Sequence, residues 1–149
     1  MIARACDAWF VPYPNDFRTA AQNVAGMQSH MERMTERAAR FGRGKLLYAA
    51  NALVIYEQDE ALARRLAEDI ERHGSGGGQV NQIHTYGLGT GLIGAKNQIL
   101  DAIARLDEIG IDMLLLKFYP AERGLKRFVD DLAPLVIGKQ AAAAGGSRA

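Results

Sequence analysis

The stretch "KLLYAANALVIY", residues 45–56, decides the fold of this chain. It is largely apolar with small residues in its middle, and the charged amphipathic segment "DEALARRLAEDIERHG" follows it at residues 59–74. A continuous apolar run bounded in this way is typical of a buried parallel strand. The second segment starts with acidic and ends with basic residues, as the dipole of a helix favours. Together they predict a strand that leads into a helix.

The same alternation of strand and helix continues on both sides of this unit. Residues 8–11 predict a short buried strand, which Pro12 and Pro14 stop. The nearly continuous apolar run "IDMLLLKF" at 111–118 predicts another parallel strand, covered on both faces. The expected strands are therefore 8–11, 45–56 and 111–118, and the expected helices are 2–6 (a last turn), 15–42, 59–74, 95–110 and 124–136. Such an order predicts an α/β fold with a parallel sheet. Three strands make a small core with two open edges, so part of a larger sheet is expected to be missing.

Composition excludes several classes of protein. The chain has 149 residues and a formal net charge of +1, which argues against a nucleic-acid-binding protein. Cys6 is the only cysteine, so neither an intrachain disulfide nor a cysteine-based zinc site is expected, and three scattered histidines show no metal-ligand spacing. No apolar run approaches the roughly 20 residues that span a bilayer. We expect a cytoplasmic protein with a disordered tail at 139–149.

The glycines of "GTGLIG", residues 89–94, have the spacing of a dinucleotide-binding turn. A genuine turn of that kind follows a buried strand, and its acidic partner ends the next strand. Here the preceding segment is polar and rich in glycine, and Asp112 stands at the start of the next expected strand. We therefore expect a flexible loop ahead of a helix, although the helix N-terminus could still attract an anion.

Four stretches resemble the luciferase-like flavin monooxygenases, in order and in approximate spacing. They are "ACDAWFV" (5–11), "NALVIYEQDEALA" (51–63), "GTGLIGAKNQILDAIARLDEIGIDMLLLKFYP" (89–120) and "FVDDLAPLV" (128–136). The resemblance covers about residues 3–137. Within the family, "NALVI" and "GLGTGLIG" are more similar to the dimethylsulfone-type monooxygenases. Alkanesulfonate members have an Arg-x-His pattern where this chain has Ala50, Asn51 and Ala52, so a sulfonate substrate is disfavoured.

The resemblance implies part of a TIM barrel, because the three strands match the sixth to eighth of the family and a whole barrel needs about 250 residues. Residues 1–138 would be the C-terminal part of such a barrel, inactive alone. The implied reaction uses reduced FMN and O₂ to oxidise a small organic substrate, with an organosulfur compound as one candidate and a flavin reductase as the supplier of reduced FMN. The alternative is a non-enzymatic interaction module that completes its sheet by self-association or with another chain.

The implied site would lie at the C-terminal ends of the strands. Asn51, Gly91 and Lys117 are the candidate cofactor-binding residues, and Tyr13, His84 and Tyr86 are candidates for the substrate side or a lid. Three of them have a plainer interpretation: Asn51 as a structural polar group, and Lys117 and His84 as solvated side chains. Trp9 and Phe10 are expected to pack in the core, as are the methionines Met27, Met31 and Met34, and no catalytic residue is identified.

Overall fold

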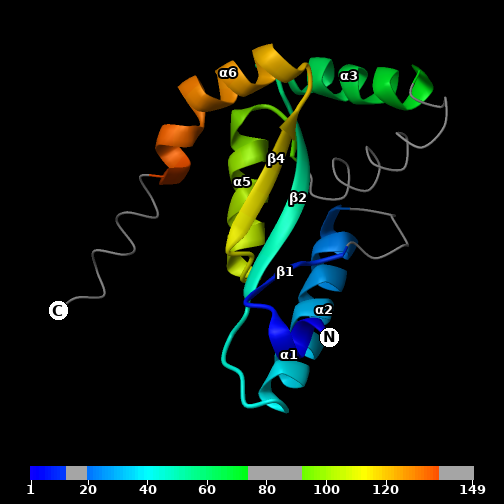
Figure 1. Ribbon diagram of the computed structural model, residues 1–149. Coiled ribbons are helices and arrows are strands. Elements are labelled where there is room, and N and C mark those ends of the chain that lie inside the picture. The colour runs from blue at the N-terminus through cyan, green and yellow to red at the C-terminus, as the bar shows by residue number, and fades with distance from the viewer. Residues whose placement is uncertain (13–19, 74–91, 138–149) are drawn as a thin grey trace.

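A computed structural model describes residues 1–12, 20–73 and 92–137 of the chain (Figure 1). Its elements are α1 (Ile2–Ala5), β1 (Ala8–Phe10), α2 (Ala20–Ala39), β2 (Leu47–Tyr56), α3 (Glu60–His73), β3 (Ile93–Gly94), α5 (Lys96–Glu108), β4 (Met113–Phe118) and α6 (Ala121–Asp131). All three expected strands and all the expected helices are present. The expected disordered tail at 139–149 lies outside the described residues.

β2 is the centre of a fully parallel sheet. It pairs with β1 from Ala8 opposite Leu47 to Phe10 opposite Ala49. It pairs with β4 along its middle, from Ala49–Met113 to Val54–Phe118, and with β3 at its end. Helices connect the strands, so the predicted α/β class is confirmed.

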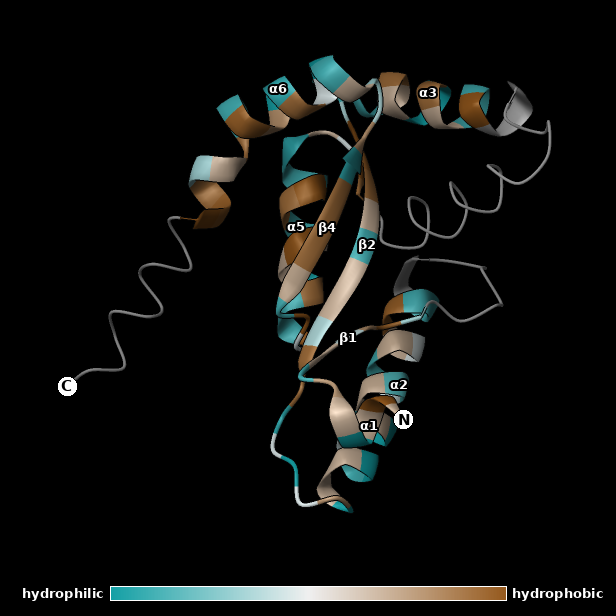
Figure 2. Cartoon of the chain, viewed as in Figure 1, coloured by the Kyte–Doolittle hydropathy of each residue, from teal (hydrophilic) through white to brown (hydrophobic). Residues whose placement is uncertain are grey.

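Helices α2, α5 and α6 cover one face of this sheet. The side chains of Tyr48 and Ala50 pack in one core cluster with the α2 methionines Met27, Met31 and Met34, which confirms their expected place in the core. A second cluster joins the end of β2 to α5 and α6 through Ala52, Val54, Tyr56, Leu92, Ile99, Ala102, Phe128 and Leu132. Figure 2 shows the apolar colour concentrated along β4 and on the sides of the helices that meet the sheet.

Among the described elements, the opposite face of the sheet is covered only at its C-terminal end. There α3 packs Ala63 and Ala67 against Leu53 and Ile55 of β2. Exposure alternates along β1 and β4, because successive side chains of a strand point to opposite faces. We call the uncovered surface the bare face; it comprises Phe10, Leu47, Asn51, Met113, Leu115 and Lys117.

The bare face overturns two expectations. Phe10 is 49% exposed rather than packed in the core, whereas Trp9 points to the helix side and meets Tyr48 edge-on with ring centroids 6.3 Å apart. β4 was expected to be covered on both faces, yet Met113 and Leu115 are about half exposed at 52% and 51%. An apolar face without a covering layer is what one side of an incomplete core exposes to solvent.

Three local boundaries also differ from the prediction. α2 ends at Ala39 rather than near Gly42, so Phe41 lies in the following turn and is 57% exposed. α6 begins at Ala121, directly after its N-cap residue Pro120, rather than at Gly124. Ile93 and Gly94, expected in a loop, form the short strand β3.

Asp112 fastens the N-terminal ends of the two main strands. Its carboxylate accepts hydrogen bonds from Lys45 Nζ and from the Tyr48 backbone N–H, both at 2.9 Å. Burial raises the pKa of Asp112, but these two donors outweigh it, so the pKa lies below its ordinary value. Asp112 thus joins the N-terminal ends of β2 and β4. A ribose-binding carboxylate lies at the C-terminal end of its strand, so Asp112 is at the opposite end of the sheet, as the sequence predicted.

Candidate functional site at the strand ends

Asn51 and Lys117 lie on the same face of the sheet. Asn51 is opposite Leu115 and Lys117 is opposite Leu53, so the two candidates are two residues apart along neighbouring strands. With strands about 4.8 Å apart and a rise of about 3.3 Å per residue, their Cα atoms are separated by about 8 Å. The structure therefore brings these two predicted residues together on the bare face.

The bare face changes character from the starts of the strands to their ends. Near the starts it is apolar, with Leu47 and Met113 at 49% and 52% exposure. Farther along, it presents the half-buried amide of Asn51 in the middle of β2 and the exposed ammonium of Lys117 near the end of β4. An apolar floor beneath a few polar groups is the usual composition of a small-molecule site.

The other predicted site residues cannot be placed. Gly91, Tyr13, His84 and Tyr86 all lie outside the described residues. Asn51 and Lys117 are consequently the two members of the predicted set that the structure locates.

Glu57 is a buried charged residue at this end of the sheet, and the sequence interpretation missed it. It is the first residue after β2, and its side chain is only 3% exposed. Arg123 of α6 donates to one carboxylate oxygen at 2.6 Å, and Arg127, one helical turn later, pairs with the other. A buried carboxylate with two guanidinium partners locks the start of α6 to the end of β2.

Tyr56 extends this polar cluster to a second carboxylate. Its hydroxyl donates a hydrogen bond of 3.2 Å to Oδ2 of Asp131 in α6. Burial, the hydrogen bond to Asp131 and the nearby negative charge all raise the pKa of Tyr56, so this hydroxyl keeps its proton at neutral pH. The cluster of Tyr56, Glu57, Arg123, Arg127 and Asp131 lies on the helix side of the strand end and acts on the site by fixing α6.

The end of the glycine motif forms a tight corner beside Glu57. Gly94 has φ of +149° and accepts the backbone N–H of Glu57 at 3.2 Å. The next residue, Ala95, donates its N–H to Oε1 of Gln98 at 2.8 Å, which satisfies one free donor at the start of α5. The motif thus continues the sheet at the site and turns the chain into a helix.

Two further features are absent from the described ranges 1–12, 20–73 and 92–137. No group of three or more His, Cys, Asp or Glu side chains in these ranges is arranged to hold a metal ion. None of the helices in the same ranges is long and apolar enough to cross a membrane.

Comparison with solved structures shows what larger fold this arrangement belongs to. No protein-family profile matches the sequence, and no curated protein matches it significantly. Three solved structures each match 93% of the chain: riboflavin lyase RcaE with modified FMN and riboflavin (TM-score 0.66, 12% identity), long-chain alkane monooxygenase LadA (0.65, 15%) and DmoA from Hyphomicrobium sulfonivorans (0.62, 12%).

The likeness confirms the fold that the sequence motifs predicted. These proteins are luciferase-like, the same group that the four sequence stretches resemble. The chain spans only 40%, 38% and 39% of their respective lengths, so it has the fold of part of their TIM barrel.

Proposed function

We propose that this chain forms the last three (β/α) units of an FMN-dependent monooxygenase barrel, with residues 1–138 as that part. The bare face is the observation that carries the proposal. In a barrel the inner face of the sheet is packed by side chains of the other strands, while the helices cover the outer face. The described sheet has α2, α5 and α6 on one face and half-exposed apolar side chains on the other, where α3 covers only the C-terminal end of β2.

Asn51 and Lys117 fit a flavin in chemistry and in position. The apolar side chains beneath them suit a flat ring system and exclude water from it. Lys117 offers an ammonium group to a phosphate, and the Asn51 amide can both donate to and accept from the polar edge of a ring. We also assign Gly91 to cofactor binding, and Tyr13, His84 and Tyr86 to the substrate side or a lid, on the family resemblance.

The chemistry proposed is the oxidation of a small organic substrate. Bound reduced FMN would supply this chemistry by reacting with O₂. An organosulfur compound is our candidate substrate, and a flavin reductase is the partner that would supply reduced FMN. The FMN named in the structure of RcaE supports the choice of cofactor. We place the protein in the cytoplasm, since a single cysteine leaves it without an intrachain disulfide.

A flavin site on this chain needs further strands to enclose it. An anaerobic fluorescence titration of the pure chain with reduced FMN tests this: we expect no site of micromolar affinity. A micromolar or tighter site would show that the strands present suffice. Translation of the DNA directly upstream provides an independent test, since it should encode strands one to five; a frame without strand–helix repeats would count against the proposal.

The alternative is a non-enzymatic module that pairs its sheet with itself or with another chain. The observation in its favour is a second apolar surface at the β4 edge, a cavity of about 340 Å³ whose lining includes Leu114, Leu116, Val136 and Ile137. Both proposals predict self-association of the isolated chain, and only the first predicts flavin binding once further strands are added.

A further inference from the structure

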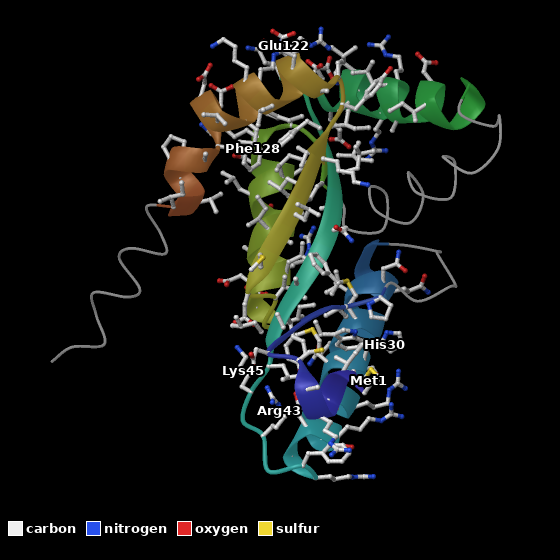
Figure 3. The ribbon with its side chains drawn as sticks, viewed as in Figure 1. Met1, His30, Arg43, Lys45, Glu122 and Phe128 are labelled. Atoms are coloured by element: carbon white, nitrogen blue, oxygen red, sulfur yellow. The ribbon has the colours of Figure 1, made fainter. Side chains whose placement is uncertain are left out.

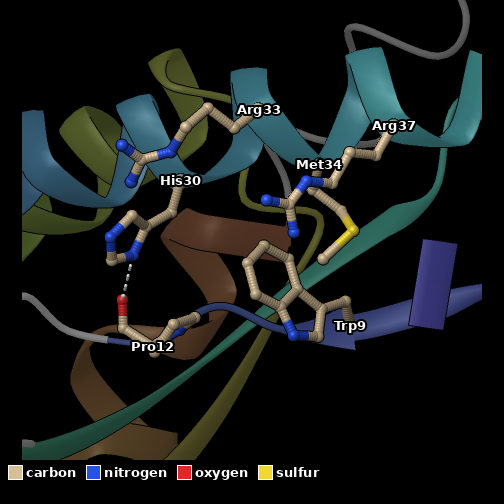
Figure 4. Close-up of a pocket in the computed structure, with 6 residues that line it drawn as sticks. All are labelled: Trp9, Pro12, His30, Arg33, Met34 and Arg37. Carbon is tan, nitrogen blue, oxygen red and sulfur yellow. Dashed lines mark hydrogen bonds between the residues drawn. The ribbon is translucent and has the colours of Figure 1, made fainter. Parts of the chain in front are cut away.

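A groove runs along α2 beside the open edge of β1. One cavity of about 310 Å³ is lined by Trp9, Pro12, His30, Arg33, Met34 and Arg37 (Figure 4). A second, of about 470 Å³, shares Met34 and Arg37 with the first and extends to Arg40, Phe41 and the N-terminal residues 1–3. Because they share two residues, the two cavities form one surface, which we call the edge groove.

The floor of the edge groove is apolar. Trp9 contributes its ring, and Met34 lies beneath it with 9% exposure. At the far end, Phe41 and Ile2 are 57% and 37% exposed. Figure 3 shows Met1 and His30 close to each other on the α2 side of the molecule. Such a strip of contiguous apolar side chains is typical of a surface that another element covers.

The wall of the groove is a stripe of positive charge. Arg33, Arg37 and Arg40 follow one another at intervals of four and three residues, so they lie on one side of α2 and of the turn that directly follows it. In the described part of the chain these three guanidinium groups make no ion pair. His30 is held at the end of the stripe by a hydrogen bond of 3.2 Å between Nδ1 and the Pro12 carbonyl oxygen.

The acidic residues of α2 are on a different side. Glu32 and Glu36 line a separate cavity together with Lys45 and Tyr48, between α2 and the C-terminal end of α5. The carboxylates of Glu32 and Glu36 thus line the cavity toward α5, whereas the three guanidinium groups line the edge groove. Like charges spaced in this way repel one another, and a partner of opposite charge would relieve that repulsion.

We propose that the edge groove docks an acidic amphipathic helix, supplied by the (β/α) unit that adjoins β1 in the completed barrel. β1 pairs only with β2 among the described strands, so its other edge is open to a neighbouring strand. In a barrel the helix belonging to that strand lies against the next helix of the outer ring, which here is α2. Its apolar side chains meet Trp9 and Met34, and its carboxylates meet Arg33, Arg37 and Arg40.

This inference rests on the proposed function for the origin of the helix, and its test involves no flavin. Trp9 is the only tryptophan, so its fluorescence reports directly on the groove. The full chain is titrated with two synthetic helical peptides of about 18 residues, long enough to be helical. They share a leucine stripe, and one has Glu where the other has Gln. We expect the Glu peptide to shift Trp9 emission and to bind at least about tenfold more tightly than the Gln peptide. This difference in affinity should be smaller at high salt.

Charge reversal supplies the matched control. In the double variant Arg33→Glu/Arg37→Glu the preference should invert, so that a peptide with Lys at the same positions binds in place of the Glu peptide. The variant Arg65→Glu/Lys96→Glu changes the net charge equally on α3 and α5 and should bind like the wild type.

Two results would overturn the proposal. One is an equal affinity for the Glu and Gln peptides, or no binding of either. The other is a Trp9 response to inorganic phosphate alone that equals the response to the Glu peptide in the same low-salt buffer. Such a response would identify a pocket for a small anion. Failure here would leave the flavin titration of the completed barrel unaffected, so the two proposals fail separately.

Discussion

Glu57 and Arg123 join the end of the central strand to the start of the last helix, with Oε1 and Nη2 2.6 Å apart. The Glu57 side chain is 3% exposed, whereas that of Arg123 is 52% exposed. The charge of the carboxylate is therefore stabilised by its two arginine partners rather than by water, whereas both arginine side chains remain partly exposed to solvent. Removing the charge of Glu57 should cost more than removing that of a surface glutamate.

Substitution of Glu57 by Gln tests this dependence. Gln keeps one acceptor but turns an amide NH₂ toward a guanidinium group, so we expect a loss of about 1–3 kcal/mol in the free energy of unfolding, measured with urea. The control is Glu60→Gln, which removes an exposed pair with Arg64 and should cost about 0.5 kcal/mol or less. Equal losses in the two variants would show that the buried cluster does not hold α6 in place.

Asp112 predicts a specific dependence of stability on pH. Its pKa is lower in the folded chain than the ordinary 3.8, so its stabilisation is complete above that value and is lost as pH falls through the lower folded pKa. The free energies of unfolding of wild type and Asp112→Asn should differ by a constant amount between about pH 6 and 8. That difference should shrink below about pH 4. The exposed Asp101→Asn is the control; a gap for Asp112→Asn that persists in acid would refute the assignment.

Gly94 tests the corner between β3 and α5. An added Cβ would lie 2.3 Å from Oε1 of Gln98, and φ of +149° disfavours any side chain. Gly94→Ala should therefore lower the free energy of unfolding by at least about 1 kcal/mol. Gly44→Ala, whose Cβ would meet no atom within 4 Å, should change it by about 0.5 kcal/mol or less. Tolerance of alanine at both positions would mean that the corner is not required.

The bare face predicts self-association through apolar contact. Leu115 is 51% exposed on that face, so Leu115→Glu should lower the average mass measured by light scattering. Leu125 of α6 is similarly exposed, at 48%, but lies on a helix, and Leu125→Glu should have a smaller effect. A monomeric wild-type chain, or an equal effect of the two variants, would argue against the bare face as the contact.

The main strands and the fold class could be predicted because the residue pattern that identifies each strand lies within one continuous segment of the sequence. An uninterrupted apolar run such as residues 45–56 identifies a buried strand without knowledge of its partners. The methionine stripe of α2 likewise fixes its buried side. β3 escaped prediction because two residues in a glycine-rich turn carry no periodic pattern, and they form a strand only because the end of β2 is available to pair with them.

The site could be predicted only in part, because its geometry depends on distant residues. Asn51 stood out as a polar residue in an apolar strand, and Lys117 as a strand-end residue. Glu57 looked like one of several acidic residues before a helix, since its partner Arg123 is 66 positions away. Phe10 was misplaced because an aromatic side chain is usually buried, whereas here no described strand or helix covers it.

The most direct test of the central claim is an anaerobic reduced-FMN titration of this chain joined to the first five (β/α) units of the long-chain alkane monooxygenase. Circular dichroism would first establish that the joined protein is folded. We expect micromolar binding by the joined protein, no such binding by the chain alone, and a loss of about tenfold or more in the variant Asn51→Leu/Lys117→Met. Two results would contradict the assignment of the bare face as a flavin wall. One is equal binding of reduced FMN by the chain alone. The other is a folded joined protein whose affinity for reduced FMN is unchanged by the two substitutions.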